Sequence, residues 1–143
     1  MSDILLDIKN LNIVYSTTDG VVRALNDANL QIRRGEALGL VGETGAGKTT
    51  LARGIMRLIP HPPGEILYEG KDLLKLSEKE MRQMRGRQIS MIFQDPMTSL
   101  NPVMTVGDQI LEVIRNHHPE FSRQEAKKQA GDMLEMVGIT AGR

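Results

Sequence analysis

Apolar and polar residues alternate along the first third of the chain, a pattern typical of half-buried β-strands. One alternating stretch covers residues 4–15, and a second begins near Ala28 and continues to Ile32. Asp19-Gly20 between them is a turn signal. We therefore expect an antiparallel β lobe at the N-terminus.

The next apolar runs have a different character. Residues 37–41 are apolar throughout, which predicts a fully buried strand, and residues 89–93 predict the next one. A short strand is expected at 65–68, before a Glu69-Gly70 turn. These segments predict an α/β core after the β lobe.

Helical periodicity and capping signals alternate with these strands. We expect a helix over about 48–58, ended by the Pro-rich segment 60–64. Ser77 and Glu80 have the spacing of a capping box, which predicts a helix through Met81 and Met84.

Two further helices are expected near the end of the chain. Thr105 has the position of an N-cap, and Ser122 with Glu125 forms a second capping box. Gly138 suits the residue after the last helix. The periodicity predicts that this helix buries Ala126, Ala130, Met133, Leu134 and Val137.

Composition narrows the function classes. The 143 residues contain 18 Lys or Arg and 18 Asp or Glu, so the overall charge gives no case for nucleic acid as a partner. Without cysteine the chain has no disulfides or thiolate metal sites, and a reducing cytoplasmic compartment is compatible. The N-terminus lacks the pattern of a secretion signal, and no apolar run approaches the length of a membrane span.

A phosphate-binding loop follows the apolar run 37–41. Residues 42–49 read Gly-Glu-Thr-Gly-Ala-Gly-Lys-Thr, which matches G-x-x-x-x-G-K-[ST] between an expected strand and an expected helix. Glycines let backbone N–H groups approach a phosphate closely, and the helix start adds the positive end of its dipole. Lys48 would supply a charge to the β- and γ-phosphates, and Thr49 a hydroxyl to Mg²⁺.

A second motif carries a family resemblance. Residues 91–102 read Met-Ile-Phe-Gln-Asp-Pro-Met-Thr-Ser-Leu-Asn-Pro and are followed by Thr105-Val106-Gly107. Together with Gly35-Glu36 and the phosphate loop, this run resembles the ATP-binding subunits of ATP-binding-cassette (ABC) transporters over residues 4–140. From Gln94 onward it is similar to the Q-loop of the dipeptide, oligopeptide and nickel importers.

The resemblance implies a fold, cofactors and partners. The fold would be α/β, a P-loop NTPase core of the ABC ATPase type with an N-terminal β lobe and the start of a helical subdomain. Residues 1–94 would form the β lobe and a partial core, and residues 95–143 the Q-loop and the first part of the helical subdomain. The cofactors would be ATP and Mg²⁺, and the partners membrane-spanning permease subunits and a second ATP-binding subunit. The complete protein would lie on the cytoplasmic, inner face of the cell membrane.

The resemblance also assigns roles. Gln94 would take the catalytic role beside the attacking water, and Thr49 and Gln94 would contact the metal. Tyr15 matches the aromatic residue that the family stacks on adenine, although a strand-end tyrosine that packs on its neighbours is the alternative. The expected nucleotide-binding residues are Tyr15, Gly42, Glu43, Thr44, Gly45, Ala46, Gly47, Lys48, Thr49 and Thr50.

Some parts of the family pattern are missing from this sequence. It contains no Leu-Ser-Gly-Gly-Gln-type signature, no apolar strand that ends in Asp-Glu and no switch histidine. We therefore expect this stretch to be inactive alone as an ATPase, and the natural protein to continue past Arg143. The alternatives are a non-transport ABC ATPase, a small P-loop kinase or GTPase, and a non-catalytic nucleotide-binding module. The GTPase is disfavoured because the chain has no Asn-Lys-x-Asp.

Overall fold

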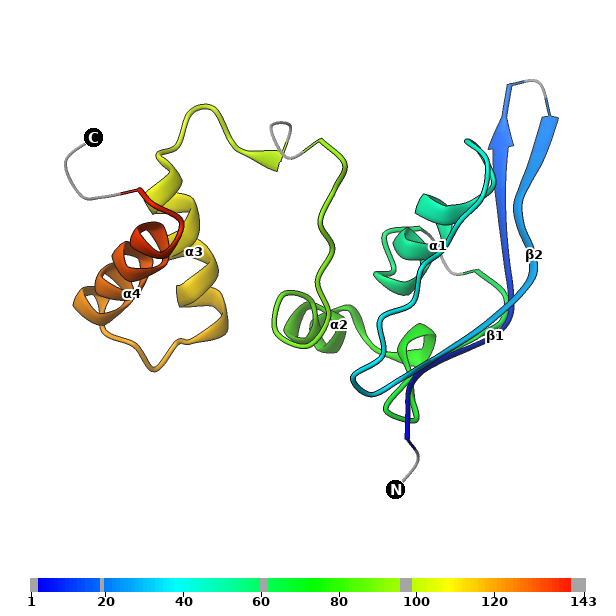
Figure 1. Ribbon diagram of the computed structural model, residues 1–143, viewed down its shortest axis with the longest axis horizontal. Coiled ribbons are helices and arrows are strands. Elements are labelled where there is room, and N and C mark those ends of the chain that lie inside the picture. Colours follow the sequence, from blue (N-terminus) through cyan, green and yellow to red (C-terminus); the bar gives the residue numbers. More distant parts are fainter. Residues whose placement is uncertain (1–2, 19, 60–61, 96–98, 140–143) are drawn as a thin grey trace. The chain divides into compact units, whose positions relative to one another are not determined.

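The computed structural model describes residues 3–18, 20–59, 62–95 and 99–139. The chain forms two compact units, Met1–Met91 and Ile92–Arg143, whose helices and strands are shown in Figure 1. The domain boundary that the sequence predicts between residues 94 and 95 stays a prediction.

A four-stranded antiparallel sheet forms the first unit. Its strands lie in the order β2-β1-β3-β4, and β1 and β2 make the long hairpin of Figure 1. This confirms the N-terminal antiparallel lobe. Gly20 of the expected turn pairs with Thr17, whereas Asp19 lies outside the described residues. The strands are β1 (Ile4–Thr17), β2 (Gly20–Arg33), β3 (Glu65–Tyr68) and β4 (Lys71–Asp72).

Burial along β1 follows the alternation of the sequence with one irregularity. Leu6, Ile8, Leu11 and Ile13 are buried, but three positions rather than two separate Ile8 from Leu11. Asn10 takes up the extra position in a left-handed conformation, with φ 49°, and the pairing register shifts there. The bulge therefore keeps the apolar residues on both sides of it on the face that meets the core.

Two short helices and a 3₁₀ turn complete the first unit. They are α1 (Lys48–Ile55), η1 (Leu73–Lys75) and α2 (Glu78–Met84). All three contribute buried side chains to the core of the sheet. The capping box is confirmed, because the Glu80 amide donates to Ser77 Oγ and the Ser77 amide donates to Glu80 Oε2 at 2.9 Å.

The second unit is a pair of helices, α3 (Val106–His117) and α4 (Arg123–Met136). Thr105 and Ser122 cap them as expected. Gly138 follows α4 at φ 82°, and its amide donates to Glu135 O while the Ile139 amide donates to Leu134 O. These two bonds satisfy the last carbonyls of the helix as a Schellman motif.

The two predicted buried strands, 37–41 and 89–93, are not formed. Leu40 is 49% exposed, Val41 is 94% exposed and Ile92 is 93% exposed. Ile89 makes only an isolated bridge to Arg85. An apolar run becomes a buried strand only where neighbouring strands satisfy its backbone, and the described part of the chain offers none to these segments.

The predicted buried face of α4 is also partly wrong. Ala126 and Ala130 are buried, but Met133 is 44% exposed and Val137 is 72% exposed. Within its unit α4 packs against α3 around Ile114, and a single neighbouring helix covers only a narrow stripe. In the part of the chain that the structure describes, no helix has the length and hydropathy needed to cross a bilayer.

Gly64 offers a test of this packing. It has φ 126°, and a Cβ there would lie 2.7 Å from Asn10 O and 2.8 Å from Leu11 Cα. Gly70 also has positive φ, 79°, but a Cβ there meets nothing within 4 Å. Gly70→Ala should therefore lower the free energy of unfolding by about 1–2 kcal/mol through backbone strain alone. Gly64→Ala should cost roughly 1–3 kcal/mol more, because backbone atoms must also move.

Urea unfolding followed by circular dichroism measures both costs. A Gly64→Ala variant no less stable than Gly70→Ala would contradict the close approach of residue 64 to the bulge.

Candidate nucleotide-binding site

The loop before α1 is shaped by glycines in left-handed conformations. Gly45 has φ 85° and Gly47 has φ 87°, and the Ala46 amide donates to Glu43 O at 3.2 Å. Residues with a Cβ adopt such conformations at a cost. The glycine spacing therefore produces a tight turn whose residues from Gly42 to Ala46 are exposed.

Gly47 has a second function in the packing of this loop. A Cβ at this position would lie 2.6 Å from Ala24 O and 2.8 Å from Leu25 Cδ2, both on β2. The end of the loop thus rests directly on the backbone of the β1–β2 hairpin. Sequence reasoning missed this support, because Ala24 and Leu25 carry no chemical signal of their own.

Gly54 brings the other end of α1 close to the sheet. A Cβ there would lie 2.9 Å from Ile13 Cδ1, so the helix packs on β1 through its own backbone. A glycine inside a helix costs helix stability, which makes it a sequence signal for such a close approach. Gly54 thus marks this contact in the sequence itself.

The first turn of α1 lacks a side-chain cap. Its N-cap is Gly47, and the first helical bond runs from the Leu51 amide to Gly47 O at 2.8 Å. The amides of Lys48, Thr49 and Thr50 come before that bond. Among the described helices, α2, α3 and α4 are each capped by a Ser or Thr side chain. The start of α1 therefore has the open amides and the dipole that bind an anion.

Lys48 places its charge in the same loop. Its Nζ donates to Gly42 O and to Glu43 O, each at 2.6 Å. Both acceptors belong to the first residues of the turn, so the lysine folds back across the loop that precedes it. The ammonium thus lies beside the first carbonyls of the loop, and the residue that carries it also contributes one of the open amides.

These groups fit a magnesium nucleotide. Backbone amides, an ammonium and the exposed Thr49 hydroxyl are the donors and the oxygen ligand that a phosphate and its Mg²⁺ require. In the described ranges, no group of three His, Cys, Asp or Glu side chains could hold a metal. Mg²⁺ suits such a place because it keeps several waters and takes its remaining oxygens from phosphates.

The structure brings only part of the predicted site together. Residues 42–50 form one continuous loop and helix start. Tyr15 lies in the same unit, half-buried, paired with Val22 and packed against the core, so its contact with adenine stays a prediction. Gln94 is exposed and belongs to the second unit, and its roles at the metal and in catalysis also stay predictions.

Comparisons with known proteins identify the family of this chain. The family model described as ABC transporter matches residues 25–143, and the chain belongs to that family. A dimeric structure of MJ0796, a bacterial ABC transporter cassette, has a TM-score of 0.80 at 26% identity. That match covers 93% of this chain and 57% of the other. The likeness confirms the fold class that the sequence predicts, an ABC ATPase core with an antiparallel β lobe.

Two curated relatives are more specific. The oligopeptide transport ATP-binding protein OppD of Bacillus subtilis (strain 168) is 53% identical over 140 residues, which are 94% of this chain and 39% of the relative. The protein of the same name in Escherichia coli (strain K12) is 44% identical over 99% of this chain and 43% of its own length. The chain thus spans about two fifths of the length of these relatives.

Gly47 and Gly45 provide a matched test of the support under the loop. Both have positive φ, but a Cβ at Gly45 meets nothing within 4 Å, whereas at Gly47 it meets β2. Gly47→Ala should therefore displace the start of α1 and shift the amide resonances of Ala24 and Leu25. Gly45→Ala should leave those two resonances in place.

Two-dimensional amide NMR of the wild type, Gly47→Ala and Gly45→Ala tests this prediction. Equal shifts at Ala24 and Leu25 in both variants would show that the loop does not rest on β2.

Proposed function

We propose that this chain forms the N-terminal part of an ATP-binding subunit that powers the import of peptides. The observation that carries the proposal is the start of α1, where uncapped amides and the Lys48 ammonium lie in one exposed loop. Such a loop is built to hold the phosphates of a nucleotide. The two curated relatives are named as oligopeptide transport proteins, which favours peptides over nickel.

The residues of the loop have distinct tasks in this proposal. The amides of residues 43–50 hold phosphate oxygens, and Lys48 exchanges its bonds with Gly42 O and Glu43 O for the β- and γ-phosphates. Thr49 holds Mg²⁺ through its hydroxyl, and Tyr15 stacks on the base. When bound, magnesium ATP supplies the phosphoryl group whose transfer to water drives transport.

The segment after Gln94 is proposed to pass the state of the nucleotide to membrane-spanning subunits. Of this segment, residues 96–98 lie outside the described residues. Gln109 folds the following loop, because its Oε1 accepts from the Asn101 amide at 3.0 Å and its Nε2 donates to Asn101 O and Met104 O. Leu100, Val103 and Met104 along this loop and Val106 at the start of α3 are all exposed, and several apolar side chains exposed on one short segment suit docking to a partner.

In the complete protein we further propose a pair of ATP-binding subunits on the cytoplasmic face of the membrane. The solved relative MJ0796 is described as a dimeric structure, which supports the pairing. A non-transport ABC ATPase and a non-catalytic nucleotide-binding module remain the alternatives, and nucleotide binding alone does not separate them from an importer.

Lys48→Ala tests the nucleotide site. Loss of a charge-assisted hydrogen-bonding group should weaken magnesium ATP binding roughly ten- to a hundredfold. Lys79→Ala removes the same charge from an exposed position at the start of α2 and should leave the affinity unchanged. Isothermal titration calorimetry measures all three affinities. No binding by the wild type, or equal binding by wild type and Lys48→Ala, would contradict the proposed site.

Gln94→Ala tests the proposed coupling in the assembled transporter. ATP hydrolysis stimulated by solute-loaded binding protein should fall roughly ten- to a hundredfold, because a metal and water contact is lost. ATP affinity should change little, since the phosphate loop is intact. Gln124→Ala, an exposed glutamine of α4, is the matched control. Full stimulated hydrolysis by Gln94→Ala would remove Gln94 from the mechanism and contradict the proposed coupling.

A further inference from the structure

The C-terminal end of α1 has an unusual residue. Arg57 follows the helix in a left-handed conformation, with φ 49°, where glycine would be least strained. Its amide donates to Gly54 O and the Leu58 amide donates to Arg53 O, both at 2.9 Å, which closes the helix as a Schellman motif. A non-glycine residue in this conformation is strained, and contacts of its side chain can offset the strain.

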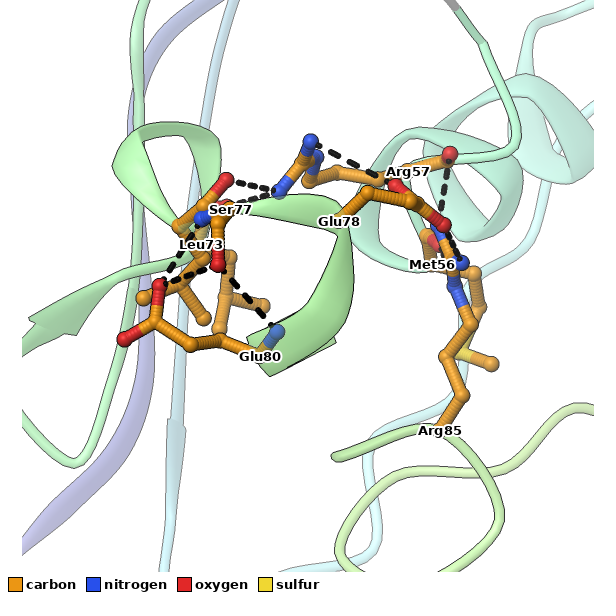
Figure 2. A network of polar contacts seen from close by, with 8 residues as sticks. Met56, Arg57, Leu73, Ser77, Glu78, Glu80 and Arg85 are labelled. Carbon is orange, nitrogen blue, oxygen red and sulfur yellow. Dashed lines mark hydrogen bonds and ion pairs between the residues drawn. The ribbon is translucent and has the colours of Figure 1, made fainter. Parts of the chain in front are cut away.

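That interaction joins α1 to η1. The guanidinium of Arg57 donates to Leu73 O at 3.1 Å and to Leu76 O at 2.7 Å, and only 10% of the side chain is exposed. The guanidinium of Arg57 is thus buried against carbonyls of η1 and of the residue that follows it, Leu76 (Figure 2).

A second arginine binds the same helix end from α2. Arg85 is the C-cap of α2, and its side chain donates from Nε to Met56 O at 2.9 Å and from Nη2 to Arg57 O at 3.0 Å. These carbonyls lie at the negative end of the α1 dipole, where a guanidinium is favourable. Figure 2 shows the side chain of Arg85 at the end of α1, whereas the side chain of Arg57 extends from that end toward Leu73.

Glu78, the first residue of α2, links the two guanidinium groups. Its Oε1 accepts from Arg85 Nη1 at 2.6 Å, and its Oε2 lies 3.7 Å from Arg57 Nη2. The hydrogen bond from Arg85 is the main reason that the pKa of Glu78 is lowered from its usual value. Arg57, Glu78 and Arg85, which we call the arginine clamp, therefore hold the end of α1, the end of η1 and both ends of α2 together.

The chain continues from the clamp toward Gln94. Directly after Arg85 it turns through Gly86, whose amide donates to Ile89 O at 2.8 Å, and the Ile89 amide donates back to Met84 O at 3.2 Å. Ile89 packs on the core of the first unit. Ile89, which this turn holds in place, therefore lies five positions before Gln94.

We propose that Arg85 is a positioning residue, which joins the phosphate-binding helix to the segment that carries Gln94. The inference rests on the proposed function. α1 has eight residues, so roughly 12 Å of rigid helix separate the phosphate loop at its start from the clamp at its end. A shift of α1 on nucleotide binding is passed to Arg85 through the Met56 and Arg57 carbonyls, and from Arg85 to the turn and residues 90–94.

Hydrogen–deuterium exchange of the 143-residue chain, with and without magnesium ATP, tests this coupling. In the wild type, the nucleotide should slow exchange in residues 43–51 and also in residues 86–94, by about fivefold or more. Arg85→Ala should keep the effect at 43–51 and lose it at 86–94. Arg85→Lys, which keeps the charge but not the two-carbonyl geometry, should lose most of it.

Arg87→Ala is the matched control, because Arg87 is an exposed arginine in the same turn. It should behave like the wild type. A purely structural role of Arg85 would speed exchange equally in the free and nucleotide-bound states, and the nucleotide-induced ratio at 86–94 would stay unchanged.

The outcomes separate this inference from the proposed function. If the wild type does not bind the nucleotide, both are overturned. If it binds but exchange at 86–94 does not slow, or slows in both Arg85 variants as much as in the wild type, the inference alone is overturned. The inference is also overturned if neither Arg85 variant binds the nucleotide, because Arg85 is then required for the fold of the site itself.

Discussion

The close approach of α1 to the β1–β2 hairpin determines the rest of the first unit. At Gly47 and Gly54 the helix lies so near β2 and β1 that a single Cβ would meet protein atoms at 2.6 Å and 2.9 Å. This contact places the start of α1, and with it the open amides, on β2, while the other end of α1 lies on β1, whose core positions are buried. The phosphate loop is exposed, yet its end rests on the backbone of β2.

The backbone groups at the two ends of α1 differ in whether they have hydrogen-bond partners. At its start no side chain caps the helix, and the amides beside Lys48 are left for an anion. At its end the Schellman bonds and Arg85 satisfy the carbonyls. Four amides and four carbonyls lack partners at the ends of any helix, so which end the protein leaves open decides where a ligand binds. Here that choice favours a phosphate.

The exposed apolar segments follow from the same physics as the buried ones. Residues 37–41 have the composition of a core strand. In the described residues, however, the sheet consists of the antiparallel strands β1 to β4, and residues 37–41 pair with none of them. Apolar surface is buried only when another surface is available to cover it. The same reason explains why α4 buries its alanine stripe against α3 while Met133 stays exposed.

Local chemistry is what the sequence determined by itself. The alternation of β1, the caps at Ser77, Thr105 and Ser122, and the glycine spacing of the phosphate loop each depend on residues a few positions apart. Tertiary structure decided what depends on distant neighbours: whether 37–41 forms a strand, that Gly47 rests on Ala24, and that Arg85 reaches the end of α1. A sequence pattern records what a segment would bury or bind, but only the fold supplies the partner.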